Sequence, residues 1–87
     1  MNMVRILLAE DDQSMREYLQ RALQRVGYEV EAVGCGTEAL PLLEPGRFDL
    51  LLTDIVMPEM DGIELAQKCN EVSPETKVMF ILSLIHI

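Results

Sequence analysis

Three acidic residues stand where two apolar segments of the sequence end. Glu10 and Asp11 follow the apolar segment 4–9, and Asp54 closes the segment 49–54. If these segments are neighbouring parallel strands, their carboxyl ends lie at one edge of a sheet, where open α/β sheets bind ligands. We therefore expect the three carboxylates to converge in one crevice.

Carboxylates that lie a few ångströms apart resist joint ionisation, so either one of them keeps a proton or a hard cation binds between them. Mg²⁺ suits this donor set because it prefers oxygen ligands and keeps water molecules that a phosphate can replace. In the alternative interpretation each acid is a solvated turn residue or a helix cap. Three acids at matched strand ends favour the magnesium site over that alternative.

The hydrophobic pattern predicts the elements that position these acids. Helices are expected between apolar strands, and Pro58 and Asp61-Gly62 mark a turn and the entry to the third helix. The resulting β-α-β-α-β-α-β order predicts an open, doubly wound parallel sheet with helices on both faces, which stops after its fourth strand. The predicted strands cover residues 4–9, 29–33, 49–54 and 77–81.

Turn and capping residues mark the ends of the first two helices. Ser14 and Glu17 have the spacing of a capping box, which predicts that a helix begins there. Gly27 stands where this helix is expected to end in a left-handed conformation. Thr37 is expected to cap a short helix that reaches Leu43.

Composition limits the classes of function. The chain has 87 residues, enough for one small domain, and its 15 acidic and 7 basic residues give a net charge of −8. This charge argues against direct binding to nucleic acid or to an anionic membrane surface. The sequence has no apolar run long enough to span a membrane and no secretory signal. Cys35 and Cys69 are interpreted as reduced thiols, which indicates a cytoplasmic protein.

Two further patterns are better explained by packing than by ligand binding. Residues 34–39 fit the dinucleotide pattern G-x-G-x-x-[GA], but they follow the second predicted strand, and nearby acids would repel a pyrophosphate. Glycines at a strand-to-helix turn are the expected explanation. Met57, Met60 and Met79 are likewise expected to be packing residues.

The segments 6–12 (ILLAEDD) and 54–62 (DIVMPEMDG) resemble the response-regulator receiver domain, a CheY-like family. The acid pair together with the D-x-x-M-P-x-M-D-G block is highly specific for that family. The resemblance runs from about Val4 to Ile81, and it implies a flavodoxin-like sheet with strand order 2-1-3-4. Within the family, the chain is most similar to the stand-alone alphaproteobacterial receivers of the CpdR type.

The resemblance implies a role in two-component or phosphorelay signalling. Asp54 would be the phosphoacceptor, which takes a phosphoryl group from phosphohistidine on a histidine kinase or a histidine phosphotransfer protein. Glu10, Asp11 and Asp54 would hold Mg²⁺ together with the backbone carbonyl of Val56. The output would be contact with a downstream protein, which in the CpdR subgroup belongs to the protease machinery, without direct contact to nucleic acid or a membrane.

Two alternatives lead to different functions. In the first, the chain is the N-terminal receiver of a longer DNA-binding response regulator, which the complete reading frame would reveal. The second, a magnesium-dependent phosphohydrolase with an aspartate nucleophile, needs another acid two residues after the nucleophile, where this chain has Val56. We therefore expect a signalling phosphoacceptor and not an enzyme, since it would catalyse at most its own phosphorylation and dephosphorylation.

The end of the sequence departs from the family pattern. Receivers have a fifth strand with a lysine, two further helices, and a switch Thr or Ser at the position of Leu82. We therefore expect residues 1–81 to form a partial receiver domain whose phosphorylation-driven switch is impaired. Residues 82–87 match the translation of a transposon-end sequencing adaptor, and we interpret them as a non-native tail.

Overall fold

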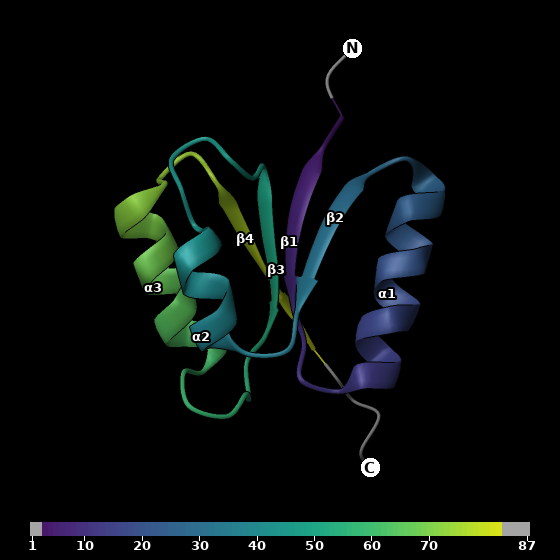
Figure 1. Ribbon diagram of the computed structural model, residues 1–87. Coiled ribbons are helices and arrows are strands. Elements are labelled where there is room, and N and C mark those ends of the chain that lie inside the picture. The colour runs from purple at the N-terminus through teal and green to yellow at the C-terminus, as the bar shows by residue number, and fades with distance from the viewer. Residues whose placement is uncertain (1–2, 83–87) are drawn as a thin grey trace.

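The computed structural model of the chain describes residues 3–82, and its strands form one parallel sheet. The strand order is β2-β1-β3-β4, which confirms the predicted doubly wound, flavodoxin-like topology. All carboxyl ends therefore point to the same edge, at the bottom of Figure 1. The strands are β1 (Arg5–Ala9), β2 (Glu29–Val33), β3 (Leu50–Asp54) and β4 (Lys77–Ile81).

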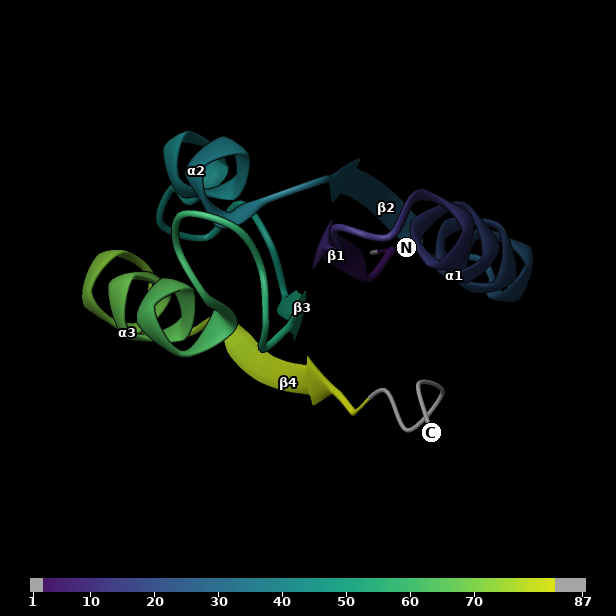
Figure 2. The ribbon, with the colours of Figure 1, turned by 90° about the horizontal axis from the view of Figure 1, so that it is seen from below.

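Helices cover the two faces of the sheet unequally, as Figures 1 and 2 show. One helix packs mainly on β2 on the first face, and two helices and a short 3-10 helix, η1, cover the second face. None of the helices within residues 3–82 is long and apolar enough to cross a membrane. The helices are α1 (Gln13–Val26), α2 (Gly36–Ala39), η1 (Leu40–Leu42) and α3 (Gly62–Val72).

The main core lies between the sheet and the second face. β1 is buried on both sides, as its continuous apolar run predicts, because alternate side chains of a strand point to opposite faces. Its residues Leu7 and Ala9 belong to the core. The other buried members of this cluster are Ala39, Leu43, Phe48, Leu51, Met57, Leu65 and Cys69.

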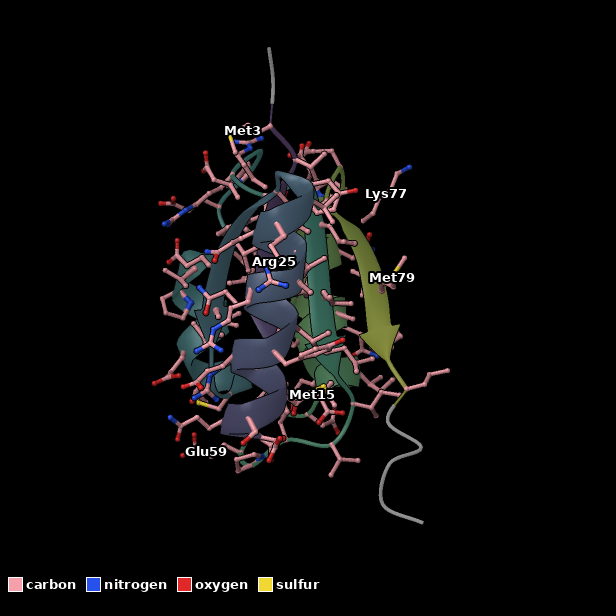
Figure 3. The ribbon with its side chains drawn as sticks, turned by 90° about the vertical axis from the view of Figure 1, so that its right-hand side faces the viewer. Met3, Met15, Arg25, Glu59, Lys77 and Met79 are labelled. Carbon is pink, nitrogen blue, oxygen red and sulfur yellow. The ribbon has the colours of Figure 1, made fainter. Side chains whose placement is uncertain are left out.

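The face that carries α1 is less completely covered. α1 has no fully buried residue. Val78 of β4 packs against the core cluster, so the next side chain, Met79, points to the face of α1. Figure 3 shows Met79 outside the area covered by α1, and 57% of this residue is exposed. Met79 was expected to be a packing residue, and that prediction is wrong because no described helix reaches β4 on this face.

The ends of the first helix correct one prediction and confirm another. The Asp12 side chain accepts a hydrogen bond from the N–H of Met15 at 2.9 Å, so Asp12 is the N-cap and not Ser14. The Glu17 side chain does not complete a capping box, because it accepts from Gln13 Nε2 at 3.0 Å. Gly27 adopts the predicted left-handed conformation, with φ 106°.

The second helix begins two residues earlier than predicted, and it ends at Ala39, where the 3-10 helix η1 continues the chain to Leu42. Cys35 is its N-cap residue and makes no side-chain capping bond, so the prediction that Thr37 caps this helix is wrong. The Thr37 hydroxyl instead donates to Glu59, on the loop that follows β3. Both Cys35 and Cys69 are free thiols. The non-native tail predicted for residues 82–87 lies outside the described residues, except for Leu82, and stays a prediction.

Candidate functional site

The register of the sheet brings the three predicted acids together. Ala9 of β1 pairs with Thr53 of β3, so the residues that follow, Glu10 and Asp54, emerge side by side at the carboxyl edge. The N–H of Glu10 also donates to the carbonyl of Val33 at 3.1 Å, which holds the chain against β2 just beyond the end of β1. One carboxylate oxygen from each of Glu10, Asp11 and Asp54 lies within 4.8 Å of the other two.

The three carboxylates differ in their contact with water. Glu10 is buried, with 3% of its surface exposed, whereas Asp54 is half-buried and Asp11 is exposed. Burial is the main reason why the pKa of Glu10 is raised to about 7, and the negative charges of Asp54 and Asp11 raise it further. The N–H of Asp12, which donates to Glu10 Oε2 at 3.0 Å, offsets part of this increase.

No basic side chain neutralises this cluster within residues 3–82, where the ion pairs involve other acids. Arg16 donates from Nη1 to the backbone carbonyl of Glu10, and not to its carboxylate, at 2.8 Å and so holds the loop between β1 and α1. This role of Arg16 could not be predicted from the sequence, because no sequence pattern marks a side chain that binds a carbonyl six residues earlier. The carboxylates are left with an excess of negative charge.

A small, hard cation fits this donor set. Mg²⁺ binds oxygen ligands at about 2.0–2.1 Å, so ligands on opposite sides of the ion are about 4 Å apart. The three carboxylate oxygens lie within 4.8 Å of one another, so a change of rotamer or a bridging water would be enough to complete the coordination. A cation would also offset the negative charges of Asp54 and Asp11, which add to the effect of burial on the pKa of Glu10.

The loop after Asp54 is closed tightly at both ends. The N–H of Gly62 donates to the carbonyl of Ile55 at 2.8 Å. A side chain at position 62 would overlap the carbonyl oxygen of Asp54, so only glycine lets α3 begin so close to the end of β3. Asp61 caps α3 by accepting from the N–H of Glu64 at 2.8 Å, and α3 begins at Gly62, which confirms the predicted helix entry at Asp61-Gly62.

The packing of this loop explains other residues that the sequence singled out. Met57 is buried and Met60 is partly buried, and both contribute to the core, as predicted. The Val56 side chain, by contrast, is 78% exposed beside Asp54. Gly36, the second glycine of the dinucleotide-like pattern, lies against this loop, because a Cβ there would be 2.6 Å from the carbonyl oxygen of Met60.

Known proteins resemble this chain in both sequence and structure. Residues 6–84 match the family described as response regulator receiver domain. The response regulator receiver protein CpdR of Brucella abortus (strain 2308) is 56% identical over 79 residues, which cover 91% of this chain and 66% of that protein. The chain therefore spans less than two thirds of the length of this relative.

Two solved structures share the fold. A CheY-like response regulator receiver domain protein from Methanospirillum hungatei JF-1 superposes with a TM-score of 0.86 and 34% identity, over 95% of this chain and 69% of that one. A chain in the complex of histidine kinase ThkA with response regulator protein TrrA gives 0.84 and 34%, over 97% and 72%. Together with the family match and the strand order, these similarities show that the chain belongs to the response regulator receiver domain family of two-component systems.

Proposed function

We propose that this chain is a phosphoacceptor receiver in which Asp54 takes a phosphoryl group from phosphohistidine. The observation that carries this proposal is the cluster of Glu10, Asp11 and Asp54 on the ends of adjacent strands, without a neutralising basic side chain among the described residues. Glu10, Asp11 and Asp54, with the backbone carbonyl of Val56, would hold Mg²⁺. When bound, Mg²⁺ supplies positive charge that offsets the repulsion between the Asp54 carboxylate and the phosphoryl oxygens.

Accessibility favours Asp54 over Glu10 as the acceptor. Asp54 is half-buried at the end of β3, where an incoming phosphoryl group can reach it, whereas Glu10 is almost completely buried. The raised pKa of Glu10 also makes it a poor nucleophile near neutral pH. Glu10 is therefore better suited to bind the cation than to accept the phosphoryl group.

The reaction needs little covalent chemistry from the protein. An oxygen of the Asp54 carboxylate attacks phosphorus, the bond from phosphorus to the histidine nitrogen breaks, and its electron pair stays on the imidazole. The product is an acyl phosphate on Asp54. Because the transition state is loose, the chain acts mainly by positioning its carboxylates. It is not an enzyme with a separate substrate, and it catalyses at most its own phosphorylation and dephosphorylation.

The partners follow from this chemistry. The phosphoryl donor is a histidine kinase or a histidine phosphotransfer protein, which is supported by the similarity to a chain in the ThkA–TrrA complex. The exposed Val56 side chain offers this donor an apolar contact beside Asp54. The output is contact with a downstream cytoplasmic protein, and the similarity to CpdR supports a partner in the protease machinery.

Acetyl phosphate with Mg²⁺ tests the acceptor assignment. Intact-mass spectrometry should detect one labile phosphoryl group, which is absent from Asp54→Asn and absent when a chelator removes Mg²⁺. Asp49→Asn is the matched control, because Asp49 precedes β3 and Asp54 ends it. A phosphoryl group that persists in Asp54→Asn would show that the acceptor is wrong.

A further inference from the structure

The loop that leaves the acceptor strand contains an unfavourable turn at Glu59. The N–H of Met60 donates to the carbonyl of Pro58 at 2.9 Å, which closes a three-residue γ-turn with Glu59 at its centre. Glu59 has φ 70° and is the one residue other than glycine with a positive φ within residues 3–82. A residue with a Cβ atom persists in this conformation only where the surrounding structure holds it.

A contact from a distant segment holds this turn. The Thr37 hydroxyl, on the first turn of α2, donates to Glu59 Oε1 at 2.8 Å across 22 residues of sequence. Because the acceptor is a carboxylate, this bond is stronger than one between neutral groups. Figure 3 shows Glu59 at the edge of the molecule to which the strands point with their carboxyl ends.

A second contact joins the same two segments through their backbones. Gly36, directly before Thr37, packs against Met60, the residue after Glu59, so closely that a Cβ at position 36 would be 2.6 Å from the Met60 carbonyl oxygen. The Thr37 hydroxyl also lies 3.2 Å from Cys35 Sγ, so its rotamer has a second polar neighbour. Residues 59 and 60 are therefore held against the start of α2 by a side chain and by close backbone packing.

The held turn lies between the acceptor and the point where its loop closes. The loop leaves Asp54, passes Val56, turns at Glu59 and returns to Gly62, whose N–H binds the carbonyl of Ile55 at 2.8 Å. Because that bond fixes the chain at Ile55, the turn at Glu59 determines the path of residues 56–58. A shift of that turn would therefore move the backbone beside Asp54.

We propose that Thr37 and Glu59 are positioning residues for phosphoryl transfer, and that their hydrogen bond holds the loop in the conformation that presents the Val56 carbonyl and the Asp54 carboxylate. This inference rests on the proposed function of Asp54. It assigns the start of α2 a role in the rate of transfer, although α2 contributes no group to the acidic cluster.

Substitution of Thr37 in the full chain tests the proposal. Thr37→Val removes the hydroxyl and keeps the shape, whereas Thr37→Ser keeps the hydroxyl. In the metal-free protein, hydrogen exchange followed by NMR should show faster exchange of the Met60 N–H in Thr37→Val, by about 3- to 10-fold, and an unchanged rate in Thr37→Ser. The rate of phosphorylation by acetyl phosphate at saturating Mg²⁺ should fall by a similar factor in Thr37→Val only.

A double-mutant cycle isolates the bond itself. Glu59→Ala keeps the Cβ atom, and with it the strain of the turn, but has no acceptor for Thr37. Each single variant should show the full loss, and Thr37→Val/Glu59→Ala should lose no more than either of them. Additive losses, or unchanged exchange of the Met60 N–H, would overturn the proposal.

The two readouts separate the failure of this inference from the failure of the proposed function. If the unaltered chain is phosphorylated on Asp54 and Thr37→Val reacts at the same rate, the positioning role is wrong and the acceptor assignment stands. If Asp54 is not phosphorylated in the unaltered chain, the proposed function fails and the positioning role fails with it. Thermal stability should change little, because both side chains are exposed.

Discussion

The amino ends of the strands lie at the top of Figure 1. At this end of the sheet, acidic side chains pair with arginines. Asp49 accepts from the backbone N–H of Arg5 at 2.8 Å and from its Nε at 3.4 Å. The backbone hydrogen bond from Arg5 is the main reason why the pKa of Asp49 is lowered, and the guanidinium lowers it further. Arg47 likewise pairs with Glu44 at 3.3 Å.

At the carboxyl ends the acids lie beside one another. Glu10, Asp11 and Asp54 have no arginine or lysine partner among the described residues, and the pKa of Glu10 is raised to about 7 by burial. The same residue types therefore serve opposite purposes in one sheet. At one end they are neutralised and favour folding, whereas at the other they oppose it and provide a site for a cation.

The largest difference between the two ends is expected when two acids are removed from one end or from the other. Glu10→Gln/Asp11→Asn should weaken Mg²⁺ binding and slow phosphorylation of Asp54 by about 100-fold or more, because even residues that only support metal ligands contribute about 10- to 100-fold. Glu44→Gln/Asp49→Asn changes the net charge equally and should leave both properties almost unchanged. Isothermal titration calorimetry and the acetyl phosphate assay measure the two effects. Equal losses in both double variants would mean that only net charge matters.

Substitution of a glycine should lower the free energy of unfolding more at the carboxyl ends of the strands, at Gly62, than at their amino ends, at Gly46. Gly62→Ala should lower the free energy of unfolding by about 2–4 kcal/mol, because the new methyl group overlaps the carbonyl oxygen of Asp54. Gly46, in the loop before β3, has φ 75° and open space around it, so Gly46→Ala should cost only about 1 kcal/mol. Urea unfolding of both variants measures the difference. A smaller loss for Gly62→Ala would contradict the close approach of α3 to β3.

The pH dependence of stability should reveal the unneutralised end. Because the pKa of Glu10 is about 7 in the folded chain and about 4.5 when unfolded, the folded state binds the extra proton between these values. The free energy of unfolding of the metal-free protein should therefore fall by about 1–3 kcal/mol as the pH rises from about 4.5 to 7. Glu10→Gln should remove this decrease, and Mg²⁺ should reduce it. If the free energy of unfolding of the unaltered chain does not change over this range, burial does not raise the pKa of Glu10.

The neutralised end should give the smallest effect, with the opposite sign. Asp49 has a lowered pKa, so its contribution is present above its ordinary pKa and is lost as the pH falls below it. Asp49→Asn should cause a small decrease in Tm at neutral pH and low salt, and the difference should vanish in about 1 M salt, because Asp49 and Arg5 are exposed. A decrease that persists in high salt would mean that Asp49 acts through packing.

The fold and the centre of the site could be predicted from the sequence because they depend on local patterns and simple topology. Uninterrupted apolar runs indicated β1 and β3, and acids that follow such strands must meet at one edge when the strands are neighbours. Gly27 ends α1 and Asp61-Gly62 opens α3, as predicted, because helix-end signals act on residues within one turn.

Two of the predictions failed because each depends on how the chain is arranged in space. One concerned which residue caps α1, and the other concerned the burial of Met79. Asp12 caps α1 instead of Ser14, because both are good caps and only the path of the loop from Glu10 decides between them. Met79 is apolar but exposed, since its burial depends on whether a helix lies over β4.

From the sequence alone follow the strand order, the convergence of Glu10, Asp11 and Asp54, and the family. Only the tertiary structure decides that burial raises the pKa of Glu10, that Gly36 makes room for Met60, and that Thr37 holds Glu59. The physical reason is that periodicity and capping act over a few residues, whereas desolvation and contacts between loops depend on distances between segments that the chain brings together only when it folds.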